Sequence, residues 1–287
     1  MIQPFMTLKR KLFRLAFNSG VKLRYRVVSK GLDKLDPDPD VGTLILPNHT
    51  SHFDTFFVMI DLYPRFQHFR IWLSDFACRI KWAQISNRYL YSMHFIEVPT
   101  ERKHELKKDP EEYKRALDRL FQRSADCLLA KKNVILHASG GSKKTPKEII
   151  THTRGVKEIL KRCPNANILL IRETGMWGSR MSHAQKKDPR WKTENHKWNF
   201  FFRRLIEMLL LNGIFFIPKR TIEIEYVMNP PDFPREGTAD EMNEYMEKFY
   251  NAKWGPEGEP FNYVPDFFWQ SRELKDKSII AEPQTHH

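Results

Sequence analysis

The sequence predicts an α/β fold, a single mixed β-sheet flanked by helices, with an amphipathic helix at the N-terminus. Short apolar runs such as residues 43–46 and 168–171 have the length of buried strands, and longer segments with helical periodicity separate them. With 287 residues and 41% hydrophobic content, the chain can bury a large core. We therefore expect one main α/β domain with appendages.

Three regions follow from composition. Residues 1–30 form a basic segment, residues 31–235 the α/β domain, and residues 236–287 a C-terminal helix and a tail rich in proline and aromatic residues that packs on the domain. The first region contains eight Lys and Arg residues and no acid. Within it, Phe5, Leu8, Leu12, Leu15 and Ala16 fall on one helical face, and Arg10, Lys11 and Arg14 on the other. This pattern predicts a helix that lies on a membrane surface or packs on its own domain, with nearly equal weight.

The first half of the chain alternates strand and helix signals. Val21, Leu23, Tyr25 and Val27 alternate with basic residues, which predicts a half-exposed strand. The apolar pattern predicts further strands at 43–46, 69–73 and 93–98, and helices at 51–62 and 76–91. A charged loop at 99–105 follows the third of these strands.

The second half continues the alternation. Asp109, Pro110 and Glu111 supply a cap, a proline at the first helical position and an acid at the positive end of the helix dipole, so a helix should run to Ala130. Strands are predicted at 133–137, 168–171, 214–217 and 221–227, and helices at 153–162 and 238–252. An insertion at 183–198, rich in Lys and Trp, is either a substrate lid or a surface loop.

The net charge of +13 predicts an anionic partner. Residues 200–211 are apolar but too short and too charged to span a bilayer, and the N-terminal charges are interspersed in a way that does not fit a signal peptide. Three widely spaced cysteines indicate reduced thiols. We expect a cytoplasmic protein bound peripherally to the inner face of an anionic membrane, and no nucleic acid as partner. The oligomeric state stays open.

A candidate catalytic pair follows the strand at 43–46. His49 falls in the turn between that strand and the next helix, where α/β proteins usually place their sites. Ser51 and Asp54 fit a capping box that would start the helix near Ser51. A carboxylate bonded to one imidazole nitrogen leaves the other nitrogen able to accept a proton from a hydroxyl. Taken alone, the pair has the ordinary interpretation of a helix cap beside a polar loop histidine. No third ligand supports a metal at His49 and His52, so we expect none.

A second candidate lies in the loop after the strand at 133–137. Gly140 and Gly141 let backbone N–H groups turn toward an anion, and Ser142, Lys143 and Lys144 add donors and charge. This composition is typical of a phosphate cradle.

Asn48, His49, four intervening residues and Asp54 resemble the H-x4-D signature of the PlsC-like glycerolipid and lysophospholipid acyltransferase family. The resemblance implies a glycerol-3-phosphate acyltransferase-like fold and transfer of a fatty acyl group from acyl-CoA or acyl-carrier protein to a hydroxyl of a glycerophosphate or lysophospholipid. It implies that His49 is the general base and Asp54 its orienting partner, with no cofactor and no covalent intermediate. The substrate-binding candidates are Asn48, Arg102, Ser139, Gly140, Gly141, Ser142 and Lys143. The chain departs from the family pattern at Val98, where a basic residue is usual, and at Ala138 and Ser139, within the family's F-P-E-G-x-R motif.

Two alternatives remain. Ser139 could be the nucleophile of a serine hydrolase or thioesterase, although His137 stands at the first glycine of a G-x-S-x-G elbow. A basic amphipathic N-terminus on a non-catalytic α/β scaffold could also serve only to bind anionic lipid.

Overall fold

The structure is a computed structural model that describes residues 3–51, 53–74, 78–79, 90–99, 109–185, 203, 206–213, 215–273, 275 and 277–282. Arg102 and His52 lie outside these residues, as do most of the helix expected at 76–91, the loop expected at 99–105 and the insertion expected at 183–198.

The described strands form one mixed sheet of seven strands in the order β1-β7-β6-β2-β5-β3-β4. They are β1 (Tyr25–Lys30), β2 (Thr43–Pro47), β3 (Phe69–Ser74), β4 (His94–Val98), β5 (Asn133–Ile135), β6 (Asn167–Thr174) and β7 (Arg220–Met228). Neighbouring strands are parallel except β6 and β7, which pair antiparallel. The predicted mixed sheet flanked by helices is confirmed.

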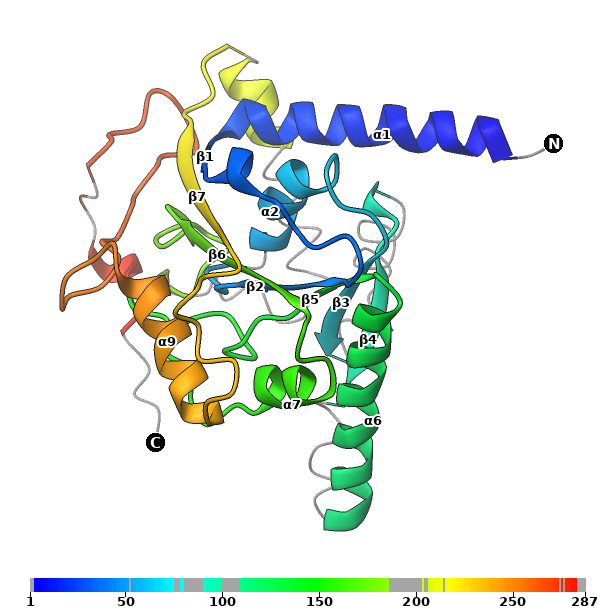
Figure 1. Cartoon of the computed structure of the whole chain (residues 1–287). Coiled ribbons are helices and arrows are strands. Elements are labelled where there is room, and N and C mark those ends of the chain that lie inside the picture. The colour runs from blue at the N-terminus through cyan, green and yellow to red at the C-terminus, as the bar shows by residue number, and fades with distance from the viewer. Residues whose placement is uncertain are drawn as a thin grey trace.

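Helices cover both faces of this sheet (Figure 1). On one face lie α1 (Gln3–Arg24) and α2 (Asp54–Leu62), and on the other α6 (Pro110–Leu129), α7 (Gly155–Arg162) and α9 (Ala239–Asn251). Single 3₁₀ turns occur at Leu32–Lys34 and Lys277–Ile279. Side chains of β2 alternate between the two layers, because Ile45 joins the cluster under α2 whereas Leu44 and Leu46 join the cluster with α6, α7 and α9. The central strand is therefore buried on both faces, as parallel strands usually are.

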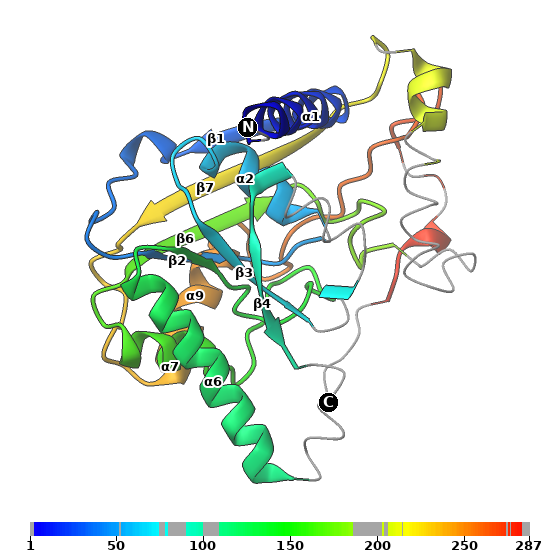
Figure 2. The same cartoon turned by 90° about the vertical axis from the view of Figure 1, so that its right-hand side faces the viewer.

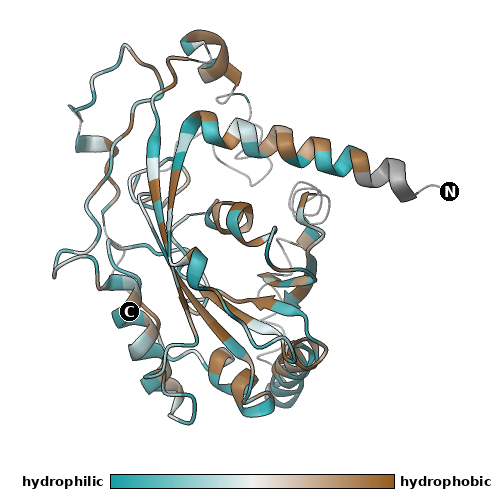
Figure 3. Cartoon of the chain, turned by 45° about the horizontal axis from the view of Figure 1, so that its top comes forward, coloured by the Kyte–Doolittle hydropathy of each residue, from teal (hydrophilic) through white to brown (hydrophobic). Residues whose placement is uncertain are grey.

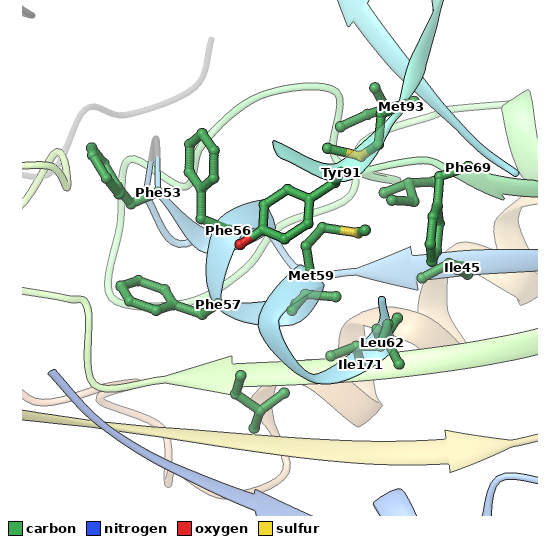
Figure 4. Close-up of a cluster of buried hydrophobic side chains, with 14 of the residues drawn as sticks. Ile45, Phe53, Phe56, Phe57, Met59, Leu62, Phe69, Tyr91, Met93 and Ile171 are labelled. Carbon is green, nitrogen blue, oxygen red and sulfur yellow. The ribbon is translucent and has the colours of Figure 1, made fainter. Parts of the chain in front are cut away.

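The core under α2 fixes the helix that follows His49. Phe56, Phe57, Met59 and Leu62 point from α2 into a cluster with Ile45, Phe69, Tyr91, Met93 and Ile171 (Figure 4). Because these side chains come from α2, from the strands beneath it and from the segment before β4, burying them holds the helix on the sheet with its first turn at the carboxyl end of β2. The position of Asp54, the first residue of α2, is set by this packing.

The predicted boundary between the N-terminal helix and the first strand was wrong. The helix was expected at 5–17 and the strand at 21–27, but α1 continues to Arg24 and β1 begins at Tyr25. Phe17 and Val21 are one helical turn apart and both pack into the cluster under α1 and α2. The alternation of apolar and basic residues at 21–24 fits a strand equally well, and this packing decides between the two.

Two other boundaries also differ. The helix expected to begin at Ser51 begins at Asp54, because Ser51 Oγ accepts a hydrogen bond from Phe53 N (3.1 Å) in the turn that precedes it. Residues 215–217 are not in a strand, so the expected pairing of 214–217 with 221–227 was wrong where the structure describes it. Instead, β7 pairs with β6 and β1.

The starts of α6 and α9 were predicted correctly. Asp109 caps α6 by accepting hydrogen bonds from Glu111 N and Glu112 N, and Thr238 forms a capping box with Glu241 at the start of α9. Hydrophobic and hydrophilic residues are mixed along the described helices (Figure 3), and none of these helices has an apolar stretch of the length that a bilayer requires.

Candidate active site

Three adjacent parallel strands bring the candidate site together. β2 pairs with β6 on one side and β5 on the other, so the carboxyl ends of all three meet at one edge. Asn48 and His49 follow β2, His137 follows β5, and Glu173 lies near the end of β6. Ligand sites of α/β sheets lie outside the carboxyl ends of the strands, where the connections from two neighbouring strands run to opposite sides of the sheet.

His49 and Asp54 form the hydrogen-bonded pair that the sequence indicated. Nδ1 of His49 lies 2.7 Å from Oδ2 of Asp54, whose side chain is almost fully buried. The carboxylate is itself held by the backbone, because Thr55 N donates to Oδ1 (2.7 Å) and Ser51 N donates to Oδ2 (3.3 Å). An imidazole bonded through Nδ1 in this way presents Nε2 to an incoming group.

The charges of the pair shift both pKa values. Burial works to lower the pKa of His49, but the carboxylate of Asp54 and its hydrogen bond outweigh burial and raise it. Burial works to raise the pKa of Asp54, but the neighbouring imidazoles of His49 and His137 and the hydrogen bond from His49 hold it at about 2. Asp54 is therefore a carboxylate at neutral pH, and His49 is a stronger base than an exposed histidine.

His137 is a residue of the candidate site that the sequence reasoning did not place beside His49. Its ring stacks on that of His49, with centroids 4.2 Å apart and an interplanar angle of 24°. Its Nδ1 lies 3.3 Å from Asn48 O and its Nε2 lies 3.3 Å from Thr55 Oγ1. Burial, reinforced by the charge of His49, lowers the pKa of His137 to about 4, so this ring is neutral at neutral pH. The signal for its role was available, because residues that follow neighbouring parallel strands meet at the same edge.

A group of potential metal ligands is formed by His49, Asp54 and His137. One ligand atom from each lies within 4.8 Å of the others, so this group could hold an ion, and it supplies the third ligand that the sequence did not reveal. Two features favour a proton-transfer site. Nδ1 of His49 is already bonded to Asp54, and stacked rings direct their nitrogen lone pairs side by side rather than toward one point. The expectation that no metal is bound stays a prediction.

Two buried glutamates support the turn that carries His49. Glu148 Oε1 accepts a hydrogen bond from His49 N (3.2 Å), and burial raises the pKa of Glu148. Asn48 donates to Glu173 O and accepts from Glu173 N, both at 2.8 Å. The predicted substrate ligand Asn48 therefore uses its amide to join the turn after β2 to the end of β6. Burial and the charge of Asp54 raise the pKa of Glu173 well above its usual value.

The loop after β5 approaches His49 directly. Ser142 Oγ lies 3.3 Å from Nε2 of His49, and Lys143 N donates to His49 O at 2.7 Å. Ser139, the predicted nucleophile, instead donates its hydroxyl to Gly141 O at 3.1 Å. A side chain added at Gly140 or Gly141 would meet nothing within 4 Å, so the backbone there is open. Within this loop, the serine that lies against the imidazole is Ser142.

Lys143, a predicted phosphate ligand, forms an ion pair with a carboxylate inside the protein. Its Nζ lies 2.5 Å from Glu259 Oε2 in an ion pair whose side chains are 4% and 3% exposed. The other carboxylate oxygen of Glu259 accepts from Gly175 N at 2.6 Å. The C-terminal tail thereby joins the loop after β5 to the turn after β6, a contact between residues far apart in the sequence.

The turn after β6 also contacts the C-terminal tail, and this predicts the effect of a glycine substitution. Gly178 has φ +93°, and a Cβ there would lie 2.5 Å from Asn262 O, whereas a Cβ at Gly140, with φ +72°, would meet nothing. Both Gly→Ala variants carry the cost of a positive φ, but Gly178→Ala should lower the free energy of unfolding by roughly 1–3 kcal/mol more than Gly140→Ala, because it overpacks the tail. Urea unfolding of both variants measures the difference, and equal losses would contradict a close contact at Gly178.

Comparison with known proteins yields similarity only to solved structures. No protein-family model and no curated protein matches the sequence. Among solved structures, the 1-acyl-sn-glycerophosphate (LPA) acyltransferase PlsC from Thermotoga maritima is similar over 86% of this chain and 79% of its own, with 14% identity and a TM-score of 0.45. A similarity at this level does not assign a reaction, so the function has to be argued from the site.

Proposed function

We propose that the protein is an O-acyltransferase that moves a fatty acyl group from a thioester, acyl-CoA or acyl-carrier protein, to a hydroxyl of a glycerophosphate or lysophospholipid. The observation that carries the proposal is the 2.7 Å bond between Nδ1 of His49 and Asp54 Oδ2, which leaves Nε2 facing the loop after β5. This pair occurs at the spacing of the acyltransferase signature that the sequence resembles.

In the proposed reaction, Nε2 of His49 removes the proton of the acceptor hydroxyl while its oxygen attacks the thioester carbonyl carbon. The carbon–sulfur bond then breaks, and the thiolate takes the proton from the imidazolium. Asp54 stabilises the imidazolium and holds the tautomer, as the aspartate of a Ser-His-Asp triad does. The neutral ring of His137 covers one face of His49 and adds no competing positive charge.

The acceptor phosphate is proposed to bind to the open backbone of Gly140 and Gly141 and to Arg102. A phosphate near His49 would add negative charge beside the base and favour its protonated form. The basic helix α1 is proposed to hold the protein on an anionic membrane, where such acceptors reside.

The acid limb of the pH profile tests the assignment of the base. The pKa of His49 is raised, so kcat/KM should fall as pH decreases, with a midpoint above about 6.5, the value of an exposed histidine. In Asp54→Asn the supporting charge is lost, so the midpoint should move to lower pH and kcat should drop by up to about 10⁴-fold. Steady-state assays across pH with lysophospholipid and acyl-CoA measure both quantities. An acid limb that does not move in the variant would contradict His49 as the base.

A second candidate function follows from Ser142. Ser142 Oγ, His49 and Asp54 are arranged as a nucleophile, base and orienting carboxylate, with distances of 3.3 Å and 2.7 Å. In this mechanism the serine oxygen attacks the thioester, His49 passes its proton to the departing thiolate, and the acyl-serine ester is cleaved by water. The chain would then be a thioesterase or serine hydrolase, with Ser142 rather than Ser139 as nucleophile.

A fluorophosphonate probe separates the two mechanisms. Labelling of Ser142 that is lost in His49→Ala would support the acyl-enzyme route. Direct transfer instead predicts no labelling and predicts that Ser142→Ala retains acyl transfer to the lysophospholipid.

A further inference from the structure

A group of large apolar side chains is exposed at the end of the molecule where α1 lies. We call it the apolar tip and define it as Leu210, Leu211, Phe215, Phe216, Phe268 and Trp269. Phe215 is 93% exposed and Leu210 is 77% exposed. Phe216 and Phe268 are in ring contact, with centroids 5.4 Å apart, so the two segments form one surface. Large exposed apolar patches are uncommon on soluble proteins and usually mark a site that binds another protein or a membrane.

Buried polar contacts hold the apolar tip in place. Asn212 donates to Asp266 O at 2.8 Å and accepts from Phe268 N at 2.9 Å, which fastens the helical residues 206–212 to the turn at 266–270. Gln270 accepts hydrogen bonds from the backbone of this turn at Asp266 and Phe267. Beneath the tip, Met208, Ile217 and Phe267 form their own small buried cluster. The exposed side chains therefore project from an ordered base.

The apolar tip is tied to α1. Leu23 of α1 packs against the buried cluster beneath the tip. Arg24, the last residue of α1, donates to Pro218 O, to Pro265 O at 2.9 Å and to Val264 O at 3.2 Å, so it contacts both segments that carry the tip. In Figures 1 and 2 the helical residues 206–212 (yellow) and α1 lie at the same end of the molecule, drawn at the top.

α1 contributes a second exposed apolar surface at that end. Arg14 lies over the ring of Tyr63 and Asn18 accepts a hydrogen bond from the Tyr91 hydroxyl, so these residues face the domain. Leu8, Leu12 and Leu15 are exposed. Leu8, Leu12 and Leu15 of the expected apolar stripe therefore face away from the domain, with the exposed Lys11 and Lys22 nearby.

We propose that the apolar tip inserts into the interfacial region of a lipid bilayer and, together with α1, gives the protein a fixed orientation on the membrane. Charge complementarity favours a lipid surface, because α1 contains no acidic residue and its Lys11 and Lys22 are exposed. The aromatic composition fits the same occupant, since Trp and Phe prefer the boundary between headgroups and acyl chains. The proposal rests on this surface and not on the proposed acyl transfer.

Flotation with vesicles tests the proposal. Wild-type protein and Leu210→Ser/Phe215→Ser are mixed with vesicles of phosphatidylcholine alone or with added phosphatidylglycerol, at low and high salt. Transferring these two side chains from water into lipid is worth at least about tenfold in partitioning, so the variant should bind at least about tenfold less to both vesicles. Deleting residues 3–17, the first part of α1, should instead remove most of the salt-sensitive part of binding.

Matched controls keep this test decisive. Leu129→Ser removes a side chain of similar exposure (59%) at the end of α6, outside both surfaces, and should bind like wild type. Circular dichroism and thermal unfolding of the tip variant should match wild type, because its substitutions lie in solvent. The same measurements on His49→Ala need no turnover, so they separate failure of membrane insertion from failure of the proposed reaction. Unchanged partitioning of the tip variant would overturn the proposal, as would lipid-free sedimentation showing a dimer that the same substitutions dissociate.

Discussion

His49→Ala should lower kcat for acyl transfer by about 10²- to 10⁴-fold while the fold stays intact, because a positioned general base contributes a factor of this size. The His49 side chain is 20% exposed, and Ser51 N and Thr55 N still hold the buried carboxylate of Asp54 when the ring is removed. The measurement is the initial rate of radiolabelled acyl transfer from acyl-CoA to a lysophospholipid, together with far-ultraviolet circular dichroism.

His137→Ala provides the matched comparison. His137 stacks on His49 but lacks the bond to Asp54, so it covers the base without replacing it. Its removal should reduce the rate much less than removal of His49. Near-normal transfer in His49→Ala would refute the proposed reaction, and equal losses in the two variants would show that the rings act as one unit.

Glu259→Ala should lower the free energy of unfolding by about 3–5 kcal/mol, the cost of leaving a buried charge without its partner. The side chains of Lys143 and Glu259 are 4% and 3% exposed, and Glu259 also accepts a hydrogen bond from Gly175 N. The substitution therefore leaves the buried ammonium without its carboxylate and the N–H of Gly175 without its acceptor. Chemical unfolding at neutral pH gives the value directly.

Two variants serve as controls for this loss. Lys143→Met/Glu259→Leu should regain much of the stability, since it removes both charges from the protein interior. Asp40→Ala breaks an exposed ion pair with Lys131, whose side chains are 84% and 57% exposed, and should leave the unfolding midpoint nearly unchanged. A loss in Asp40→Ala as large as that in Glu259→Ala would show that burial does not set the cost.

The sequence predicted the fold well wherever a local signal specified an element. Asp109 and Thr238 begin α6 and α9 at the expected places, and the apolar run at 43–46 is β2. At the junction of α1 and β1 the local pattern allowed both structures, and only the packing of Val21 under the helix decides. Residues 215–217 have strand composition, but Phe215 and Phe216 face solvent and Ile217 packs into a small buried cluster, an arrangement that the local sequence does not specify.

The same distinction applies to the candidate site. His49 and Asp54 are five residues apart and could be paired from their spacing. His137 required the knowledge that β5 lies beside β2. The partner of Lys143 could not be found at all, because Glu259 comes from a tail that no periodicity places next to the loop after β5. Sequence reasoning thus found the hydrogen-bonded pair and missed His137 and Glu259.

The pairing of β1 with β7 has a consequence for how the protein folds while the ribosome is still making it. β1 is near the N-terminus, and its described partner in the sheet, β7, is separated from it by most of the chain. β1 must therefore wait for its partner until nearly all of the chain has been made, a delay that long-range pairing imposes on folding. During that interval α1, with its exposed leucines, has left the ribosome ahead of its own domain. The newly made chain is thus expected to need a chaperone or an early encounter with lipid at this helix.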